Sequence, residues 1–253
     1  MSLHCSTLGA GRNLVLVHGW GTHGSIWSEM AEGLARHFRV HVVDMPGYGE
    51  SADCEPYSLH HVAAMLAREM PPRCGVVGWS LGGQVALAWA RAAPEQVKRI
   101  ALIATTPCFA QRADWPHAVS RETLQEFGRS LAADGPGTLR RFFSLQALGD
   151  EHTREAVARL RGCLKHDGAP SAAALAGGLN VLLEADQRDE LPAIRQPVLV
   201  VHGERDRVAP PAAGRHLARS LPAAELVLIP GAAHVPFVTA LPEVSAHLSR
   251  FFQ

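Results

Sequence analysis

The chain has 253 residues, 47% of them hydrophobic, which is enough to bury the core of one large α/β domain, with or without an insertion. Its 24 basic and 24 acidic residues balance, which argues against a nucleic acid or an anionic membrane as partner. Five scattered cysteines without a C-x-x-C pair, no signal-peptide pattern and no apolar run of about 20 residues favour a reduced, cytoplasmic chain.

Short apolar runs alternate with amphipathic ones through the first hundred residues. We expect strands at 14–18, 40–44, 75–79 and 100–104, and helices at 25–37, 59–70 and 84–91. Strands that alternate with helices form right-handed βαβ units. The pattern therefore predicts an α/β fold, a mostly parallel central sheet with helices on both faces.

The alternation stops after residue 107. Between 108 and 188 no convincing strand is found, and helices are expected near 120–133, 138–148, 153–165 and 171–186. Strands return at 197–202 and 225–229, with a helix at 211–221 between them. We expect a core made of 1–107 and 189–253, with 108–188 as a helical lid over the edge where the strands end. A separate helical domain is the alternative.

A nucleophile is expected within Gly78-Trp79-Ser80-Leu81-Gly82, which has the form G-x-S-x-G. A strand is predicted before this pentapeptide and a helix after it. A strand that turns sharply into a helix exposes the serine hydroxyl, and the glycines remove Cβ atoms that would clash. The helix start also directs N–H groups toward this position. These features predict that Ser80 attacks a substrate.

The partners of such a serine follow it in the order acid, then histidine, each after a strand. The loop after the strand at 197–202 offers Asp206 and Glu204, and we favour Asp206 because a rigid turn follows it. The loop after the last strand carries His234 among small residues. His202 also ends a strand, but it precedes the acid and is rejected as the base.

In this triad, neutral His234 takes the proton of Ser80 as the hydroxyl attacks a carbonyl carbon, and Asp206 fixes the imidazole. The oxyanion that forms needs fixed N–H donors, each typically contributing about 3–4 kcal/mol to transition-state stabilisation. The N–H of Leu81 follows the nucleophile and is one expected donor. The N–H of Trp20, between two glycines in the loop after the first predicted strand, is the other.

The sequence predicts no cofactor and no metal. It contains no H-E-x-x-H motif and no acidic cluster with ligand spacing. The second glycine-rich run, at 44–51, lacks the ending of a phosphate loop and the dinucleotide fingerprint. We expect this run to form a structural turn beside the site.

With these residues in place, the chain resembles the α/β-hydrolase superfamily over essentially its whole length. Within it, the chain resembles the family of pimeloyl-[acyl-carrier-protein] methyl ester esterases of biotin biosynthesis. The similarity covers segments 16–21, 44–49, 78–83, 107–109, 114–116, 141–146 and 232–237. The hydrolase motifs are shared across the superfamily. The specific resemblance to this family rests on Trp79, the Pro-Cys-Phe at 107–109 and the Arg-Phe and Leu-Gln pairs within 141–146.

The resemblance implies a serine carboxylesterase that removes the methyl ester of a pimeloyl chain carried by acyl carrier protein. Methanol leaves first, and water then releases the free carboxylate from an acyl-enzyme. The residue types suit an apolar channel for a straight chain, with walls from Trp20, Trp79, Leu81, Phe142 and Val208. Packing within the lid is the alternative for Phe142 and its neighbour Phe143.

Acyl carrier proteins are acidic, so the resemblance also implies a basic docking surface on the lid. Residues 129–165 hold seven cations against four acids, namely Arg129, Arg140, Arg141, Arg154, Arg159, Arg161 and Lys165 against Asp134, Asp150, Glu151 and Glu155. We assign docking to Arg141 and Arg154, and add Arg140 and Arg159, where the pattern departs from that of the family. A solvated, salt-bridged helix face is the alternative.

Two other classes of function remain open. The same triad serves small-ester carboxylesterases, lactonases and C–C bond hydrolases, which differ in the lid. A non-catalytic binding protein of the same fold usually loses a triad residue or the glycines, and all are present here. We expect a monomer.

Overall fold

The computed structural model describes residues 2–163 and 168–253. Within them the strands form one sheet in the order β1-β3-β2-β4-β5-β6-β7. β1 pairs antiparallel with β3, and every other pairing is parallel, as predicted. The strands are β1 (Cys5–Leu8), β2 (Arg12–Val17), β3 (Phe38–Val43), β4 (Cys74–Trp79), β5 (Val97–Ile103), β6 (Val198–Gly203) and β7 (Ala224–Ile229).

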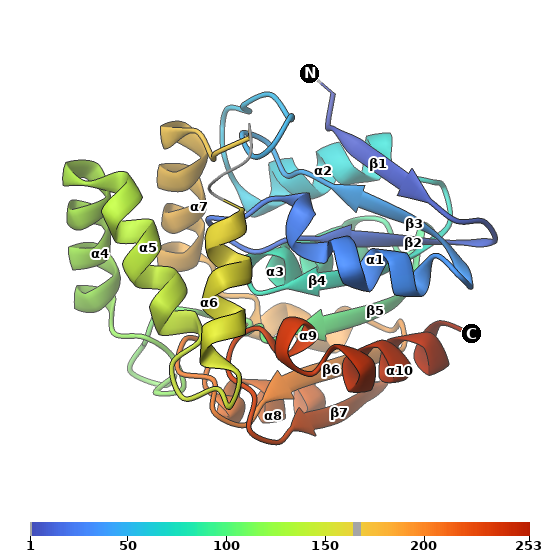
Figure 1. Ribbon diagram of the computed structural model, residues 1–253. Helices are drawn as coiled ribbons and strands as arrows, with labels where there is room; N and C mark the ends of the chain where they lie inside the picture. Colours follow the sequence, from blue (N-terminus) through green and yellow to red (C-terminus); the bar gives the residue numbers. More distant parts are fainter. Residues whose placement is uncertain (1, 164–167) are drawn as a thin grey trace.

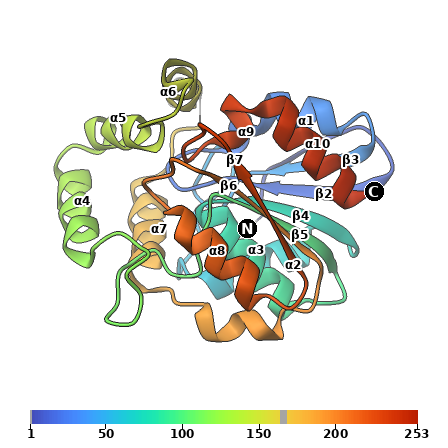
Figure 2. The ribbon, with the colours of Figure 1, turned by 90° about the horizontal axis from the view of Figure 1, so that it is seen from below.

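Helices cover both faces of the sheet (Figures 1 and 2). One face carries α2 (Leu59–Glu69), α3 (Leu81–Ala92) and α8 (Pro211–Ser220). The other face carries the 3₁₀ helix η1 (Gly24–Trp27), α1 (Ser28–Leu34), α9 (Pro236–Thr239) and α10 (Leu241–Phe252). The chain between β5 and β6 forms α4 (Arg121–Ala133), α5 (Gly135–Gln146), α6 (Thr153–Gly162), α7 (Ala172–Glu184) and the 3₁₀ helix η2 (Arg188–Ala193).

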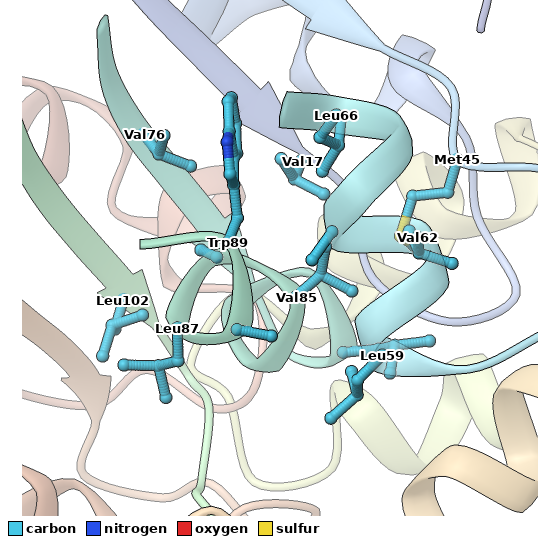
Figure 3. Close-up of a cluster of buried hydrophobic side chains, with 14 of the residues drawn as sticks. Val17, Met45, Leu59, Val62, Leu66, Val76, Val85, Leu87, Trp89 and Leu102 are labelled. Atoms are coloured by element: carbon cyan, nitrogen blue, oxygen red, sulfur yellow. The ribbon is translucent and has the colours of Figure 1, made fainter. Parts of the chain in front are cut away.

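The central strands are buried on both faces, which explains why they read as continuous apolar runs. Val15 and Val17 of β2 face one hydrophobic cluster, whereas Leu14 and Leu16 face the other. Figure 3 shows the first cluster, where side chains of the sheet meet those of α2 and α3. Each fully buried aliphatic or aromatic side chain contributes about 1.5–3 kcal/mol. The two layers therefore hold the strand ends, and the loops after them, in fixed positions.

Local capping explains where three of the four α-helices described between β5 and β6 begin. Ser120 Oγ accepts the N–H of Thr123 at α4 over 3.1 Å, and Ser171 Oγ accepts the N–H of Ala174 at α7 over 3.0 Å. Asp134 caps α5, with a proline in the first turn. A cap of this kind stabilises a helix by about 1 kcal/mol. These three helices therefore start close to where the sequence predicts them, whereas α6 starts at Thr153 without a side-chain cap.

Some elements differ from the sequence prediction. β1 was not predicted, because its residues are exposed or half-buried and show no apolar alternation. The helix expected at 25–37 is divided into η1 and α1 and ends at Leu34. The helices α9 and α10 at the C-terminus were also missed, and the predicted end of the helix at 153–165 lies outside the described residues. No helix in the described part of the chain is long and apolar enough to cross a bilayer.

Candidate active site

Ser80 lies at the junction of β4 and α3, in a backbone conformation that side chains rarely adopt. Its φ is 55° and its ψ is −119°. The glycines around it leave no room for a side chain: a Cβ on Gly78 would lie 2.4 Å from the carbonyl oxygen of Gly82, and one on Gly82 would lie 2.4 Å from that of His18. Thr105 Oγ1 donates to the carbonyl of Ser80 over 2.6 Å. The strained turn is thus held by close packing.

Three polar side chains from three strand ends form a continuous hydrogen-bonded chain at this edge of the sheet. His234 Nε2 lies 3.0 Å from Ser80 Oγ, and His234 Nδ1 lies 2.8 Å from Asp206 Oδ2. All three are buried, with residual exposures of 5% for Ser80, 4% for Asp206 and none for His234. Glu204, the other candidate acid, is exposed. The spacing suits transfer of the serine proton to an imidazole oriented by a carboxylate.

The carboxylate of Asp206 stays ionised although it is buried. Burial disfavours the charged form, but the attraction of His234 and hydrogen bonds from His202 and His234 outweigh it, so the pKa of Asp206 lies far below its ordinary value. The other oxygen, Oδ1, accepts the backbone N–H groups of Val208 (2.8 Å) and Ala209 (2.9 Å). The acid is therefore a fixed anion at neutral pH.

The loop after β2 is organised around the carbonyl of Gly19. His18 Nδ1 lies 2.9 Å from this oxygen and Thr22 Oγ1 donates to it over 3.1 Å. His18 Nε2 accepts the N–H of Met45 over 2.9 Å, so the ring hydrogen is on Nδ1. Burial lowers the pKa of His18 to about 4, which keeps the ring neutral. Because C=O and N–H point in opposite directions in a trans peptide, the N–H of Trp20 points away from these donors.

Neither expected oxyanion donor is used elsewhere among the described residues. The N–H groups of Leu81 and Trp20 make no hydrogen bond to another described group. Leu81 opens α3, where the first N–H groups have no partner within the helix. Both groups are thus free to bind an anionic oxygen.

Trp79 supports two of the loops that carry the site. Its Nε1 donates to the carbonyl of His234 over 2.9 Å, and its ring lies against Phe237. A Cβ on Gly19 would come within 2.8 Å of the same ring. Trp79 is fully buried and joins the β2 loop to the His234 loop.

An aromatic cluster joins the β2 loop to the lid. Trp20 meets Phe127 of α4 and Phe142 of α5 edge to face, with ring centroids 5.4 and 5.3 Å apart. Phe142 is half-buried, whereas its neighbour Phe143 is fully buried and packs in the core. Val208, in the acid loop, is 7% exposed. Phe127 was not singled out in the sequence, because a single phenylalanine on an amphipathic helix carries no distinguishing signal.

The lid helix α7 lies directly against this cluster. Trp20 Nε1 donates to the carbonyl of Leu175 over 3.0 Å. A Cβ on Gly178 would lie 2.7 Å from Trp20 Cδ1 and 3.1 Å from the hydroxyl of Tyr48. Only glycine therefore lets α7 approach the indole this closely.

Asp150, counted among the lid acids in the sequence, is buried at the base of the lid. Its Oδ2 accepts the N–H of Ala233 over 2.7 Å and the hydroxyl of Thr239 over 3.0 Å. The carbonyl of Gln146 also accepts the N–H of His234 over 3.1 Å. The lid and the histidine loop are therefore connected on both sides of His234. Asp150 is therefore a buried acid and does not belong with the surface acids among which the sequence analysis counted it.

The four arginines expected to dock a partner fall into two groups. Arg140 and Arg154 are exposed and have no ion-pair partner among the described residues. Arg141 is also exposed, 3.8 Å from Asp134. Arg159 binds Ser28 and lies 3.4 Å from Glu29, which ties α6 to α1. Lys165, the last cation of the set, lies outside the described residues.

The chain is similar to known proteins over nearly its whole length. Residues 12–241 match the family model described as alpha/beta hydrolase fold. The chain is 43% identical to a pimeloyl-[acyl-carrier protein] methyl ester esterase of Nitrosomonas europaea, over 94% of each chain. It is 42% identical to the protein of the same name from Chromobacterium violaceum, over 94% of this chain and 93% of that one.

Solved structures show the same architecture. An esterase from Exiguobacterium antarcticum superposes with a TM-score of 0.91 at 21% identity, covering 99% of this chain and 95% of that one. The enol-lactonase from Burkholderia xenovorans superposes with a TM-score of 0.85 at 25% identity, covering 98% and 95%. The architecture is thus shared by an esterase and an enol-lactonase.

Proposed function

The chain belongs to the α/β-hydrolase fold family, and we propose on this basis that it is a serine carboxylesterase acting on the methyl ester of pimeloyl-[acyl-carrier protein]. The observation that carries this proposal is the hydrogen-bonded chain from Ser80 through His234 to Asp206, in a protein 43% identical to esterases of that name. The products are pimeloyl-[acyl-carrier protein] and methanol.

The reaction proceeds through two tetrahedral intermediates. Ser80 Oγ attacks the ester carbonyl while His234 Nε2 takes its proton, and the resulting imidazolium is stabilised by Asp206. Leu81 and Trp20 N–H groups bind the oxyanion. The imidazolium then gives its proton to the departing methoxy oxygen, and methanol leaves. Water, deprotonated by the same imidazole, cleaves the acyl-enzyme and returns the proton to Ser80.

The decisive test is mass spectrometry of methyl pimeloyl-carrier protein incubated with the enzyme. We expect a loss of one methylene in mass, from –OCH₃ to –OH, that disappears in the Ser80→Ala variant. A serine-directed phosphonate should label the wild type and leave Ser80→Ala unlabelled. No loss of mass alongside fast hydrolysis of p-nitrophenyl acetate identifies a general esterase instead, and no labelling identifies a binding protein.

We further propose that acyl carrier protein docks on the exposed cations of α5 and α6. Arg140, Arg141 and Arg154 form this docking surface, because they are exposed and are not held in close ion pairs. Arg159 is a weaker member of this surface, because the nearby carboxylate of Glu29 offsets part of its positive charge. The surface suits the acidic face of a carrier protein, since complementary charges accelerate association and orient the partners.

Charge reversal separates docking from catalysis. The double variant Arg141→Glu/Arg154→Glu should raise KM for carrier-linked substrate at least tenfold and leave turnover of p-nitrophenyl acetate unchanged. Arg195→Glu is the matched control, because this exposed arginine precedes β6 at the opposite edge of the sheet. Equal losses on both substrates, or equal losses in the control, contradict the docking surface.

We also propose that the chain acts as a monomer in the cytoplasm. The five cysteines are all free, which suits a reducing compartment. Analytical sedimentation of the purified enzyme measures its mass and so tests the monomer. Subcellular fractionation tests whether the enzyme is in the cytoplasm.

A further inference from the structure

A second histidine, His202, contacts the acid of the triad. It lies at the end of β6 and is fully buried, and its Nε2 lies 3.4 Å from Asp206 Oδ2 and 2.6 Å from the carbonyl oxygen of Ala209. We propose that His202 is a positioning residue for the proposed esterase reaction, holding the Asp206 carboxylate in the orientation that His234 requires.

The position of the ring hydrogen follows from the partners. A carbonyl oxygen and a carboxylate oxygen both accept hydrogen bonds, so Nε2 must carry the hydrogen and donate it. This hydrogen is donated to the carbonyl oxygen of Ala209, and Asp206 Oδ2 lies 3.4 Å from the same nitrogen, on the side of its partial positive charge. Nδ1 has no hydrogen-bond partner among the described residues. The ring thus acts on the acid through one N–H.

Asp206 therefore accepts three hydrogen bonds and has a fourth contact, with His202, and together these fix its orientation. Val208 and Ala209 N–H groups hold Oδ1, while His234 and His202 share Oδ2. Ala209 is bound twice, because its N–H holds Asp206 and its carbonyl accepts from His202. The ring therefore links the end of β6 to the far end of the acid loop. Rotation of the carboxylate, which would misalign His234, breaks at least two of these bonds.

The opposite side of the ring is closed by α8. A Cβ on Gly214 would lie 2.6 Å from His202 Nδ1, so a glycine there lets the ring reach the acid loop. The titratable side chains that act on Asp206 are His234 and His202. The charged groups nearest in sequence point elsewhere: Arg207 and Arg215 are exposed, and His216 packs on Trp115.

The proposal predicts a chemical effect that simple packing does not produce. His202→Phe keeps the ring and removes the donor, so kcat should fall about tenfold while KM changes little. A carboxylate that loses a donor holds the proton of the His234 imidazolium more strongly. The acidic limb of the kcat/KM profile should therefore move to higher pH. His202→Gln, whose amide reaches the position of Nε2, should restore most of kcat and return the limb toward wild type.

Gly214→Ala tests the same contact without changing a polar group. The added methyl should displace the ring and reproduce the kcat loss and the shift of the limb, and should have no further effect in the His202→Phe background. Ser80 acylation by p-nitrophenyl acetate is the assay, with circular dichroism to verify folding. Equal activity of the Phe and Gln variants, or an unchanged acidic limb in folded His202→Phe and Gly214→Ala proteins, overturns the proposal. The wild-type protein and its variants could show the expected pattern with p-nitrophenyl acetate while the wild type fails to cleave methyl pimeloyl-carrier protein. That outcome refutes the proposed substrate and leaves the role of His202 in place.

Discussion

The neutral, buried His18 predicts a specific dependence of stability on pH. The unfolded chain binds a proton on this ring below its ordinary pKa of 6.5, whereas the folded protein binds it only below about 4. Between these values protonation favours the unfolded state, so stability is present above pH 6.5 and is lost as the pH falls. For a group fully buried in the fold, the loss between pH 7.5 and 4.5 is about 2.5 kcal/mol.

The variant His18→Gln separates this contribution from those of the other histidines. Its amide oxygen can accept the N–H of Met45 as Nε2 does, but it does not titrate. Loss of the bond to the Gly19 carbonyl should cost about 1 kcal/mol at pH 7.5. We expect the variant to be less stable than wild type at pH 7.5, and more stable at pH 4.5 by about 1.5 kcal/mol.

The measurement is the free energy of unfolding in urea at pH 7.5, 6.5, 5.5 and 4.5. The exposed His37, changed to Gln, is the control. The curves of wild type and His18→Gln should cross between pH 5 and 6.5, since about 1 kcal/mol of linkage then offsets the lost bond. If the free energies of unfolding of wild type and His18→Gln changed with pH in parallel, this would falsify the assignment of a neutral His18. The hydrogen bond from His18 to the Gly19 carbonyl would then also be wrong.

Three further changes test the supports of the site. Gly178→Ala should push Trp20 away from the position we propose for an oxyanion donor and lower kcat/KM at least tenfold. Gly162→Ala, with open space around its Cβ, should leave kcat/KM unchanged, and equal kcat/KM of the two variants contradicts the packing argument. Trp79→Phe removes the bond to the His234 carbonyl and should cost about 1 kcal/mol of stability and lower kcat more than it raises KM, read from urea unfolding and steady-state kinetics. Asp150→Ala leaves the N–H of Ala233 without a partner and should lower stability by about 2–4 kcal/mol with a loss of kcat, and an unchanged midpoint of unfolding refutes its role.

The sequence predicted the parallel sheet and most helix starts because these depend on local patterns. Apolar runs bounded by capping residues such as Ser120 and Ser171 are visible in the chain. The order of Ser80, Asp206 and His234 also depends only on strand succession. β1 escaped prediction because its register is set by pairing with β3, not by its own pattern.

The supporting residues could not be predicted in the same way. His202 was set aside as the base in the sequence, and its contact with Asp206 depends on how the loop 203–209 folds back. Asp150 reads as one more acid on a helical insertion, and only its contact with Ala233, 83 positions away, reveals its role. Such contacts arise from tertiary structure and leave no periodicity in the sequence.

The glycine pair of α7 divides the lid into parts with different freedom to evolve. A Cβ on Gly177 would lie 2.5 Å from that of Tyr57, and one on Gly178 would meet Trp20. Helix α7 therefore packs tightly against the core, although it lies in the same insertion as α4 to α6. Helices α4 to α6 carry the exposed arginines and Phe142, and their exchange between relatives should transfer substrate preference. A graft that also replaces α7 should lose turnover on every ester. We therefore expect the part of the insertion that sets substrate preference to end just before residue 171.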